Sequence, residues 1–193
     1  MSVNIITISR EFGSGGRHIG ELTAKKLGYD YYDKIIIQKI AEESGLSEEF
    51  IERSGESAPS KNIFAYAFVG RDNTGFSVND YLNSVQSKII LDIAKKGSCV
   101  IVGRCADYVL KDRTDCVNIF VHGDMDKKIE RISKLHNISN EEAKRLIKDT
   151  DKKRRINYNY YTDREWGRMQ NYTMTLNSSE LGYDKCIDII TNL

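Results

Sequence analysis

The chain has 193 residues, of which 40% are hydrophobic and 30% charged, with a formal net charge of +1. This composition is typical of a soluble globular protein, and the length suffices for one buried domain with a small insertion. A near-neutral charge excludes a general attraction to nucleic acid or to anionic membranes, so any phosphate binding must depend on a local basic cluster. No apolar run approaches the ~20 residues of a membrane span.

The first half of the chain alternates short apolar runs with helical patterns. Val3–Ile8 predicts a strand that is covered on both faces, because its apolar residues are nearly continuous. Gly15–Leu27 predicts a helix, Tyr29–Tyr32 a short second strand, and Lys34–Glu43 a helix with isoleucines on one face. Ser47 is predicted to cap a further short helix.

The segment 54–77 differs from its surroundings, because it holds the only proline, Pro59, and scattered aromatic residues. We interpret it as an insertion over the edge of the sheet. Regular patterns then return, and Ser139 with Glu142 predicts a capping box that opens a long helix. The remaining predicted elements are helix Val78–Lys96, strand Cys99–Val102, strand Cys116–Val121, a helix from Asp124, strand Tyr172–Leu176 and helix Tyr183–Leu193.

This strand–helix alternation with short connections predicts an α/β domain over residues 1–193, with a parallel sheet covered on both faces. Four cysteines are present without C-x-x-C spacing, and we expect them to be reduced and mostly buried. The N-terminus lacks a basic region followed by an apolar stretch, so we expect no secretory signal and a cytoplasmic location. The three histidines show no metal-ligand spacing.

The segment Ser9–His18, Ser-Arg-Glu-Phe-Gly-Ser-Gly-Gly-Arg-His, lies between the first predicted strand and helix. A strand, a glycine-rich turn and a helix form the layout that binds phosphate, because the first N–H groups of the helix are unpaired and carry partial positive charge. Arg17 adds a charge that can hold a phosphate by two hydrogen bonds. The alternative is a tight turn without a ligand. Against the usual Gly-x-x-x-x-Gly-Lys-Ser/Thr loop, three of four fixed positions differ.

Other polar residues follow predicted strands, and the carboxyl ends of parallel strands meet at one edge of a sheet, where ligands bind. Asp33 is a candidate contact to a second substrate, or only a helix cap. Gly103–Arg104 is placed to point into the same crevice, or Arg104 forms a surface salt bridge with Asp107 or Asp112. Asn177–Ser179 follows the last strand.

A basic cluster, Asp151–Arg155, lies on the long predicted helix. Such runs are most often solvated faces. A second interpretation is a nucleic-acid contact, with the tyrosines at 158, 160 and 161 as stacking groups, but the near-neutral net charge disfavours it. A third is a lid whose cations neutralise a phosphoryl group during transfer.

Five segments together carry a family resemblance: Ile6–Arg17, Leu27–Asp33, Val100–Arg104, the spacing Asp151-x-x-Arg154, and Leu176–Leu181. With these motifs the chain resembles the cytidylate kinase-like group, a branch of the P-loop nucleoside monophosphate kinases. The resemblance runs nearly end to end, with 54–77 at the position of the monophosphate-binding insertion.

The resemblance implies a three-layer P-loop kinase fold with a parallel core of roughly five strands and a lid over 139–168. It also implies transfer of the γ-phosphoryl group of ATP, with Mg²⁺, to a (deoxy)cytidine monophosphate-like acceptor. The implied roles are donor-phosphate binding by Gly13, Ser14, Gly15, Gly16, Arg17 and His18; catalysis by Arg17, Lys153, Arg154 and Arg155; contact with the ATP base region by Asn177, Ser178 and Ser179; and acceptor binding by Asp33 and Arg104.

The chain departs from the cytidylate kinase pattern at the loop and after the third strand. Arg17 replaces a lysine, and its planar fork cannot follow a lysine's narrow path. His18 replaces a small residue, Ile19 stands where a hydroxyl meets Mg²⁺, and Cys105 stands where an aspartate contacts the acceptor. Glu11 places a negative charge at the mouth of the loop, which should repel ATP unless Mg²⁺ or Arg10 compensates it. Our hypothesis is that Glu11 helps to hold the metal, through water or directly.

Two further classes of function therefore stand beside a nucleoside monophosphate kinase. One is a nucleotide-binding or regulatory protein that has lost catalysis, and the other is a kinase for a different small-molecule acceptor. A weaker alternative is an RNA contact through residues 152–161. The expected partner is a nucleotide or another phosphorylated small molecule, without a membrane, and the sequence leaves open a monomer or a homodimer.

Overall fold

The computed structural model describes residues 3–51 and 78–193, and the predicted insertion 54–77 lies outside these residues. The described part contains a five-stranded sheet in the order β2-β3-β1-β4-β5, in which every neighbouring pair is parallel. The strands are β1 Ile5–Arg10, β2 Asp30–Tyr32, β3 Cys99–Val102, β4 Cys116–His122 and β5 Met174–Asn177. This confirms the predicted α/β fold with a parallel sheet.

Both faces of the sheet are apolar because successive strand residues point to opposite sides. On β1, Ile5 joins one buried cluster while Ile6 and Ile8 join another. The central place of β1, between β3 and β4, explains the nearly continuous apolar run that predicts it.

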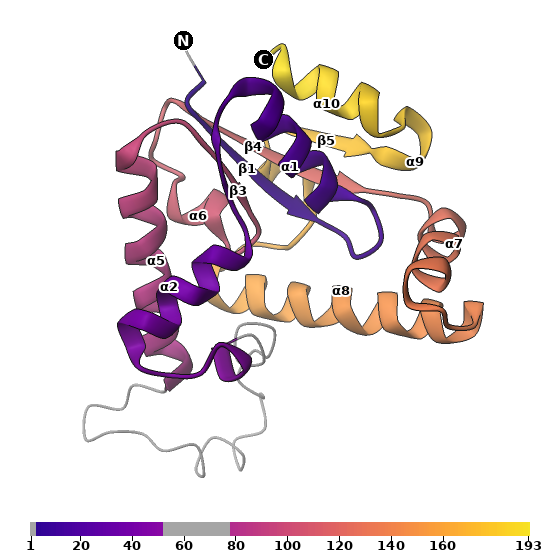
Figure 1. Cartoon of the computed structure of the whole chain (residues 1–193), viewed down its shortest axis with the longest axis horizontal. Coiled ribbons are helices and arrows are strands. Elements are labelled where there is room, and N and C mark those ends of the chain that lie inside the picture. The colour runs from indigo at the N-terminus through magenta and orange to yellow at the C-terminus, as the bar shows by residue number, and fades with distance from the viewer. Residues whose placement is uncertain (1–2, 52–77) are drawn as a thin grey trace.

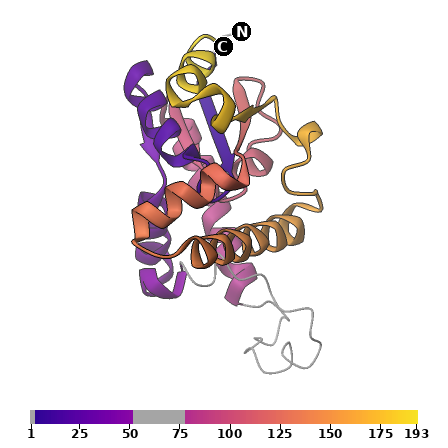
Figure 2. The same ribbon diagram turned by 90° about the vertical axis from the view of Figure 1, so that its right-hand side faces the viewer.

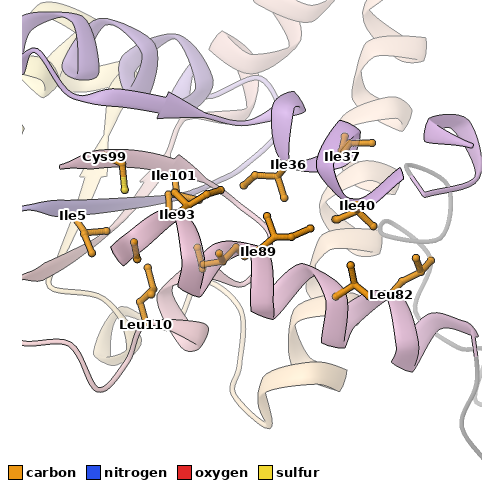
Figure 3. Packing of buried hydrophobic residues seen from close by; sticks show 14 of the residues in the cluster. Ile5, Ile36, Ile37, Ile40, Leu82, Ile89, Ile93, Cys99, Ile101 and Leu110 are labelled. Carbon is orange, nitrogen blue, oxygen red and sulfur yellow. The ribbon is translucent and has the colours of Figure 1, made fainter. Parts of the chain in front are cut away.

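Helices form one layer on each face (Figure 1). On one side, α2 Lys34–Ser44, α5 Val78–Lys96 and α6 Ala106–Val109 cover the cluster that contains Ile5. Figure 3 shows Ile36 and Ile40 of α2 pointing toward Ile89 of α5, in the same buried cluster. On the other side lie α1 Gly16–Leu27 and α10 Tyr183–Thr191, which contact each other.

The carboxyl end of the sheet is crossed by α8, Asn140–Thr162, as Figures 1 and 2 show. It follows α7, Met125–His136, and the predicted capping box is present: Ser139 Oγ accepts from the N–H of Glu142, whose carboxylate accepts from the N–H of Ser139 at 2.9 Å. The shorter elements are the 3₁₀ turn η1 Met169–Asn171 and α9 Ser178–Leu181.

Several element boundaries differ from those predicted by one or two residues. β1 continues two residues beyond Ile8, because Ser9 and Arg10 stay paired with β4. β5 starts at Met174 instead of Tyr172. Tyr172 does not join the strand, because its N–H donates to Met169 O and closes the turn η1. The short helix α6 was not predicted, because only four residues form it.

All four cysteines are free, and three are buried. Within residues 3–51 and 78–193, no helix has the length and apolar character to cross a bilayer.

Candidate active site

The glycine-rich segment forms a loop between the end of β1 and the start of α1. Gly15 is the N-cap of α1 with φ 80°, and no side chain caps this helix end. A Cβ at Gly15 would lie 2.6 Å from two ring carbons of Tyr183, so both the positive φ and the close packing require glycine. The N-terminus of α1, with its partial positive charge, is therefore open toward an anion.

Serine hydroxyls hold the loop in shape from inside the protein. Ser14 Oγ donates to Glu11 O at 2.9 Å, and the buried Ser178 Oγ lies 2.7 Å from Ser14 O and 2.9 Å from His122 O. Two further bonds reach Asp124 in the turn before α7. Asn177 Nδ2 donates to Asp124 Oδ1 at 3.0 Å, and Ser179 Oγ accepts from the Asp124 N–H at 2.8 Å.

The loop opens into a cleft of about 780 Å³ at the carboxyl end of the sheet. Its walls come from the end of β2, from α2, α5 and the turn after β3, and from α7 and α8. The cleft brings together ten of the predicted site residues: Glu11, Gly13, Gly15, Gly16, Arg17, His18, Asp33, Arg104, Lys153 and Arg154. It does not include Ser14, Arg155, Asn177, Ser178 or Ser179 among its lining residues.

Arg17 forms an ion pair with Asp33 across the cleft, from its Nε to Asp33 Oδ2. Burial lowers the pKa of Arg17, but the hydrogen bond and the charge of Asp33 outweigh it, and the net pKa is raised. Asp33 occupies the N-cap position of α2, yet its side chain makes no capping bond. The capping interpretation is therefore wrong for the side chain, because the carboxylate is committed to Arg17.

Arg104 lies at a strained turn after β3. Gly103, Arg104 and Cys105 all have positive φ, at 74°, 59° and 54°. Two consecutive non-glycine residues in this region cost of order 1–3 kcal/mol each and persist only where the surroundings fix them. Gln86 Nε2 donates to Arg104 O at 3.1 Å and helps to fix them. Arg104 lines the cleft, while Asp107, the predicted alternative partner, is buried with its Oδ2 accepting from Tyr158 OH at 2.6 Å.

A carboxylate–lysine network, made of Glu11, Lys128 and Asp151, joins the loop to α7 and α8. Lys128 Nζ lies 2.8 Å from Glu11 Oε2 and 3.7 Å from Asp151 Oδ2, with only 5% of its side chain exposed. Asp151 Oδ1 also accepts from the N–H of Phe12 at 2.7 Å. Burial raises the pKa of Asp151 despite these partners. The network fixes the middle of α8 against the loop.

Arginines on α8 approach the same region. Arg154 Nη1 donates to Arg10 O at 3.0 Å and lies 3.9 Å from Asp151 Oδ1. The Arg155 guanidinium lies 5.9 Å from the ring centre of Trp166, which is the range of a cation–π contact. Lys153 lines the cleft beside Arg154.

The sequence analysis missed Lys128 as a partner of Glu11, and it considered Arg10 only as a charge that could compensate Glu11. Arg10 lines the cleft as the last residue of β1. The available signal was its place at the carboxyl end of the central strand, which the predicted strand end at Ile8 concealed. Lys128 gave no signal, because a lysine on a charged helix is most often exposed.

The chain is similar to known proteins in sequence and in fold. Residues 5–180 match the profile of the cytidylate kinase-like family. The chain belongs to this family. No curated protein matches the chain. Among solved structures, an uncharacterized protein from Eubacterium ventriosum is 25% identical with a TM-score of 0.72, over 97% of this chain and 96% of that one.

Two kinases share the fold at lower identity. Shikimate kinase from Bacteroides thetaiotaomicron is 14% identical with a TM-score of 0.57, over 97% of this chain and 96% of that one. Shikimate kinase from Acinetobacter baumannii, in complex with shikimate, is 13% identical with a TM-score of 0.54, over 97% and 90%. The fold is that of the P-loop kinases, and the cytidylate kinase-like family together with this fold supports a small-molecule kinase.

Proposed function

We propose that this member of the cytidylate kinase-like family transfers the γ-phosphoryl group of ATP to a (deoxy)cytidine monophosphate-like acceptor, in the cytoplasm. The observation that carries the proposal is one cleft lined by the uncapped N-terminus of α1 with its own Arg17, by Arg104 after β3 and by Arg154 of α8. Phosphoryl transfer needs little covalent chemistry from the protein; it needs positioning and cations where charge develops.

The donor side of the proposed site is the glycine loop. The backbone N–H groups of Gly13 to Gly16 would bind the donor phosphates, with Arg17 and His18 at the start of α1 beside them. Arg17 must then exchange its carboxylate partner, Asp33, for phosphate oxygens, which an arginine can bind by two parallel hydrogen bonds. Asn177–Ser179, beside the loop, would lie near the ATP base.

The acceptor side consists of Asp33 and Arg104, and the lid is the segment 139–168. Arg154, with Lys153 and Arg155 near it, would neutralise the charge on the transferring group and help to exclude water. Because Arg154 donates to the main chain of the residue just before the loop, α8 is already in contact with the donor side.

Kinases of this type use Mg²⁺, which is held mainly by substrate phosphates and water. Glu11 is a poor direct ligand, because its Oε2 already accepts from the Gly123 N–H at 3.2 Å and faces Lys128 Nζ. In residues 3–51 and 78–193, no three acidic, histidine or cysteine side chains gather into a metal site. We therefore assign Glu11 at most a contact through water. A Glu11→Gln variant with the same Mg²⁺ dependence as the wild type would remove even that role.

The deciding experiment is a turnover assay with ATP, Mg²⁺ and a panel of nucleoside monophosphates, in which the formation of ADP is measured. We expect turnover with CMP or dCMP, and a loss of at least about 100-fold in Arg17→Ala, because that charge acts in the transition state. Lys25→Ala, an exposed lysine on the same helix, is the matched control and should keep full activity.

Two observations favour a second candidate, a nucleotide-binding protein without catalysis: Arg17 is held by Asp33, and Ile19 replaces the metal-binding hydroxyl. ATP binding that needs Arg17, without turnover of any acceptor, would establish this candidate. Shikimate belongs in the panel as well, because a neighbour of the same fold is a shikimate kinase in complex with it.

A further inference from the structure

The side chain of Arg10 packs against two glycines, Gly16 and Gly103, which leave the space that it occupies. Its stem lies against Gly16, where an added Cβ would be 2.6 Å from Arg10 Cβ. Its guanidinium lies against Gly103, where an added Cβ would overlap Arg10 Nη1 and lie 3.2 Å from Cζ. Any larger residue at either glycine would displace Arg10, so the loop and the turn after β3 together make room for this one arginine.

Within residues 3–51 and 78–193, the Arg10 side chain makes no ion pair and no side-chain hydrogen bond, although its backbone carbonyl accepts from Arg154. Its surroundings are cationic: burial, and then the charges of three other arginines of the cleft with Arg154 first, lower the pKa of Arg10 to about 9, while Asp33 opposes them. A guanidinium in such surroundings raises the free energy of the protein alone, and an anion in the cleft removes that cost.

The stem of Arg10 lies against the loop at Gly16, but its guanidinium points toward the turn after β3 at Gly103. Gly13 and Gly15 pack against α7 and α10, on one side of the loop. The Arg10 guanidinium instead lies over the end of β3, the strand between β1 and β2, so it is on the side of Asp33 and Arg104. An anion there would be bound by Arg10 together with Arg104.

We infer that Arg10 binds an anionic group of the acceptor, and that this group is a phosphate. The inference rests on the proposed function and extends it with a residue at the end of the central strand. A phosphate suits the site better than a carboxylate, because its two negative charges and several acceptor oxygens can engage more than one guanidinium at once.

The test is calorimetric titration of inorganic phosphate into the whole protein, with and without saturating ADP to occupy the glycine loop. We compare the wild type with Arg10→Met, which keeps the stem, with Arg10→Lys, which keeps the charge, and with Arg145→Met, an exposed arginine on α8, as the matched control. We expect phosphate affinity to fall about 10-fold or more in Arg10→Met, less in Arg10→Lys, and not in the control, with ADP affinity unchanged.

Each other outcome has a distinct meaning. Equal phosphate affinity in Arg10→Met and the wild type would overturn the inference. Loss of ADP binding in Arg10→Met would move Arg10 to the donor side and overturn the acceptor assignment. Acetate that binds as tightly as phosphate, with the same dependence on Arg10, would overturn the choice of phosphate. If the wild type fails to bind ADP, the proposed function fails, while the titration without ADP still decides the role of Arg10.

Discussion

The two sides of the cleft differ in whether their buried charges are paired with opposite charges. On the α8 side, the carboxylate–lysine network of Glu11, Lys128 and Asp151 pairs every charge with a partner inside the protein. On the β3 side, Arg10 faces other arginines, and Arg104 stands on a strained turn. We call Arg10 and Arg104 the arginine wall.

The difference separates charges that maintain the fold from the charge of Arg10, whose side chain has no ion pair within residues 3–51 and 78–193. A buried charge that keeps its partner can fix two elements together, and removing one partner is strongly destabilising. A charge held among like charges and on strained backbone lowers stability, and it is retained where it binds something absent from the protein alone. Substitutions on the two sides should therefore differ in the sign of their effect on stability.

The largest effect is expected from Asp151→Ala. This change leaves the Phe12 N–H without its acceptor and Lys128 with one carboxylate fewer in a buried position. We expect a loss of about 3 kcal/mol in the free energy of unfolding, measured by urea denaturation. Asp149→Ala, an exposed aspartate on the same helix, should change it by less than about 0.5 kcal/mol. Equal losses in the two variants would show that the network does not hold α8.

A smaller and pH-dependent effect is expected from Asp107, which lies behind the arginine wall. Its side chain is buried, its Oδ1 has no hydrogen-bond partner in the described part of the chain, and burial raises its pKa above the ordinary 3.8. The fold therefore favours the protonated form. Stability from this group is full below the unfolded pKa and is lost as pH rises through the folded pKa.

The measurement is the difference in unfolding free energy between the wild type and Asp107→Asn, from about pH 4 to about pH 8. We expect the advantage of the wild type to shrink as the pH rises. The control variant is Asp112→Asn, at an exposed aspartate nearby, for which the difference in unfolding free energy from the wild type should not change with pH. A wild-type advantage that grows with pH would mean that Asp107 is stabilised as a carboxylate.

The elements that form the cleft could be predicted from the sequence, but the pairing of the charges within it could not. The apolar runs, the glycine loop and the capping box are local signals, and they place the strand ends at one edge of the sheet. The pairing of Arg17 with Asp33 and of Glu11 with Lys128 joins residues 16 and 117 positions apart, and no local pattern carries that information.

The role proposed for Arg10 was hidden by a two-residue error in the end of a strand. A run that ends in Ser9 and Arg10 has no apolar residue to mark its last pair, although backbone pairing with β4 continues to Val121. The predicted contact of Asn177–Ser179 with a nucleotide base remains a prediction. Their hydrogen bonds to the loop and to the turn before α7 are a property of the folded chain that their sequence order conceals.

A modest effect is expected at the far end of α8, where local forces alone act. Ser139→Ala removes the hydroxyl that accepts from the Glu142 N–H, and we expect a loss of about 1 kcal/mol in unfolding free energy. Ser133 is the control, because its hydroxyl donates to Glu130 O inside α7 instead of capping a helix. Ser133→Ala should be neutral or slightly stabilising, since alanine is the better helix former. A loss in both variants would show that the serines act by packing.

The smallest expected change has the opposite sign. Arg10→Met keeps the stem against Gly16 and removes a charge that faces other arginines, so we expect a gain of about 0.5 kcal/mol in unfolding free energy. Added NaCl should raise the stability of the wild type more than that of the variant, because salt screens the repulsion that the variant no longer has. Urea denaturation at low and high salt measures both effects. A clear loss of stability in Arg10→Met would place Arg10 with the paired charges of the α8 side, and the distinction between the two sides of the cleft would then fail.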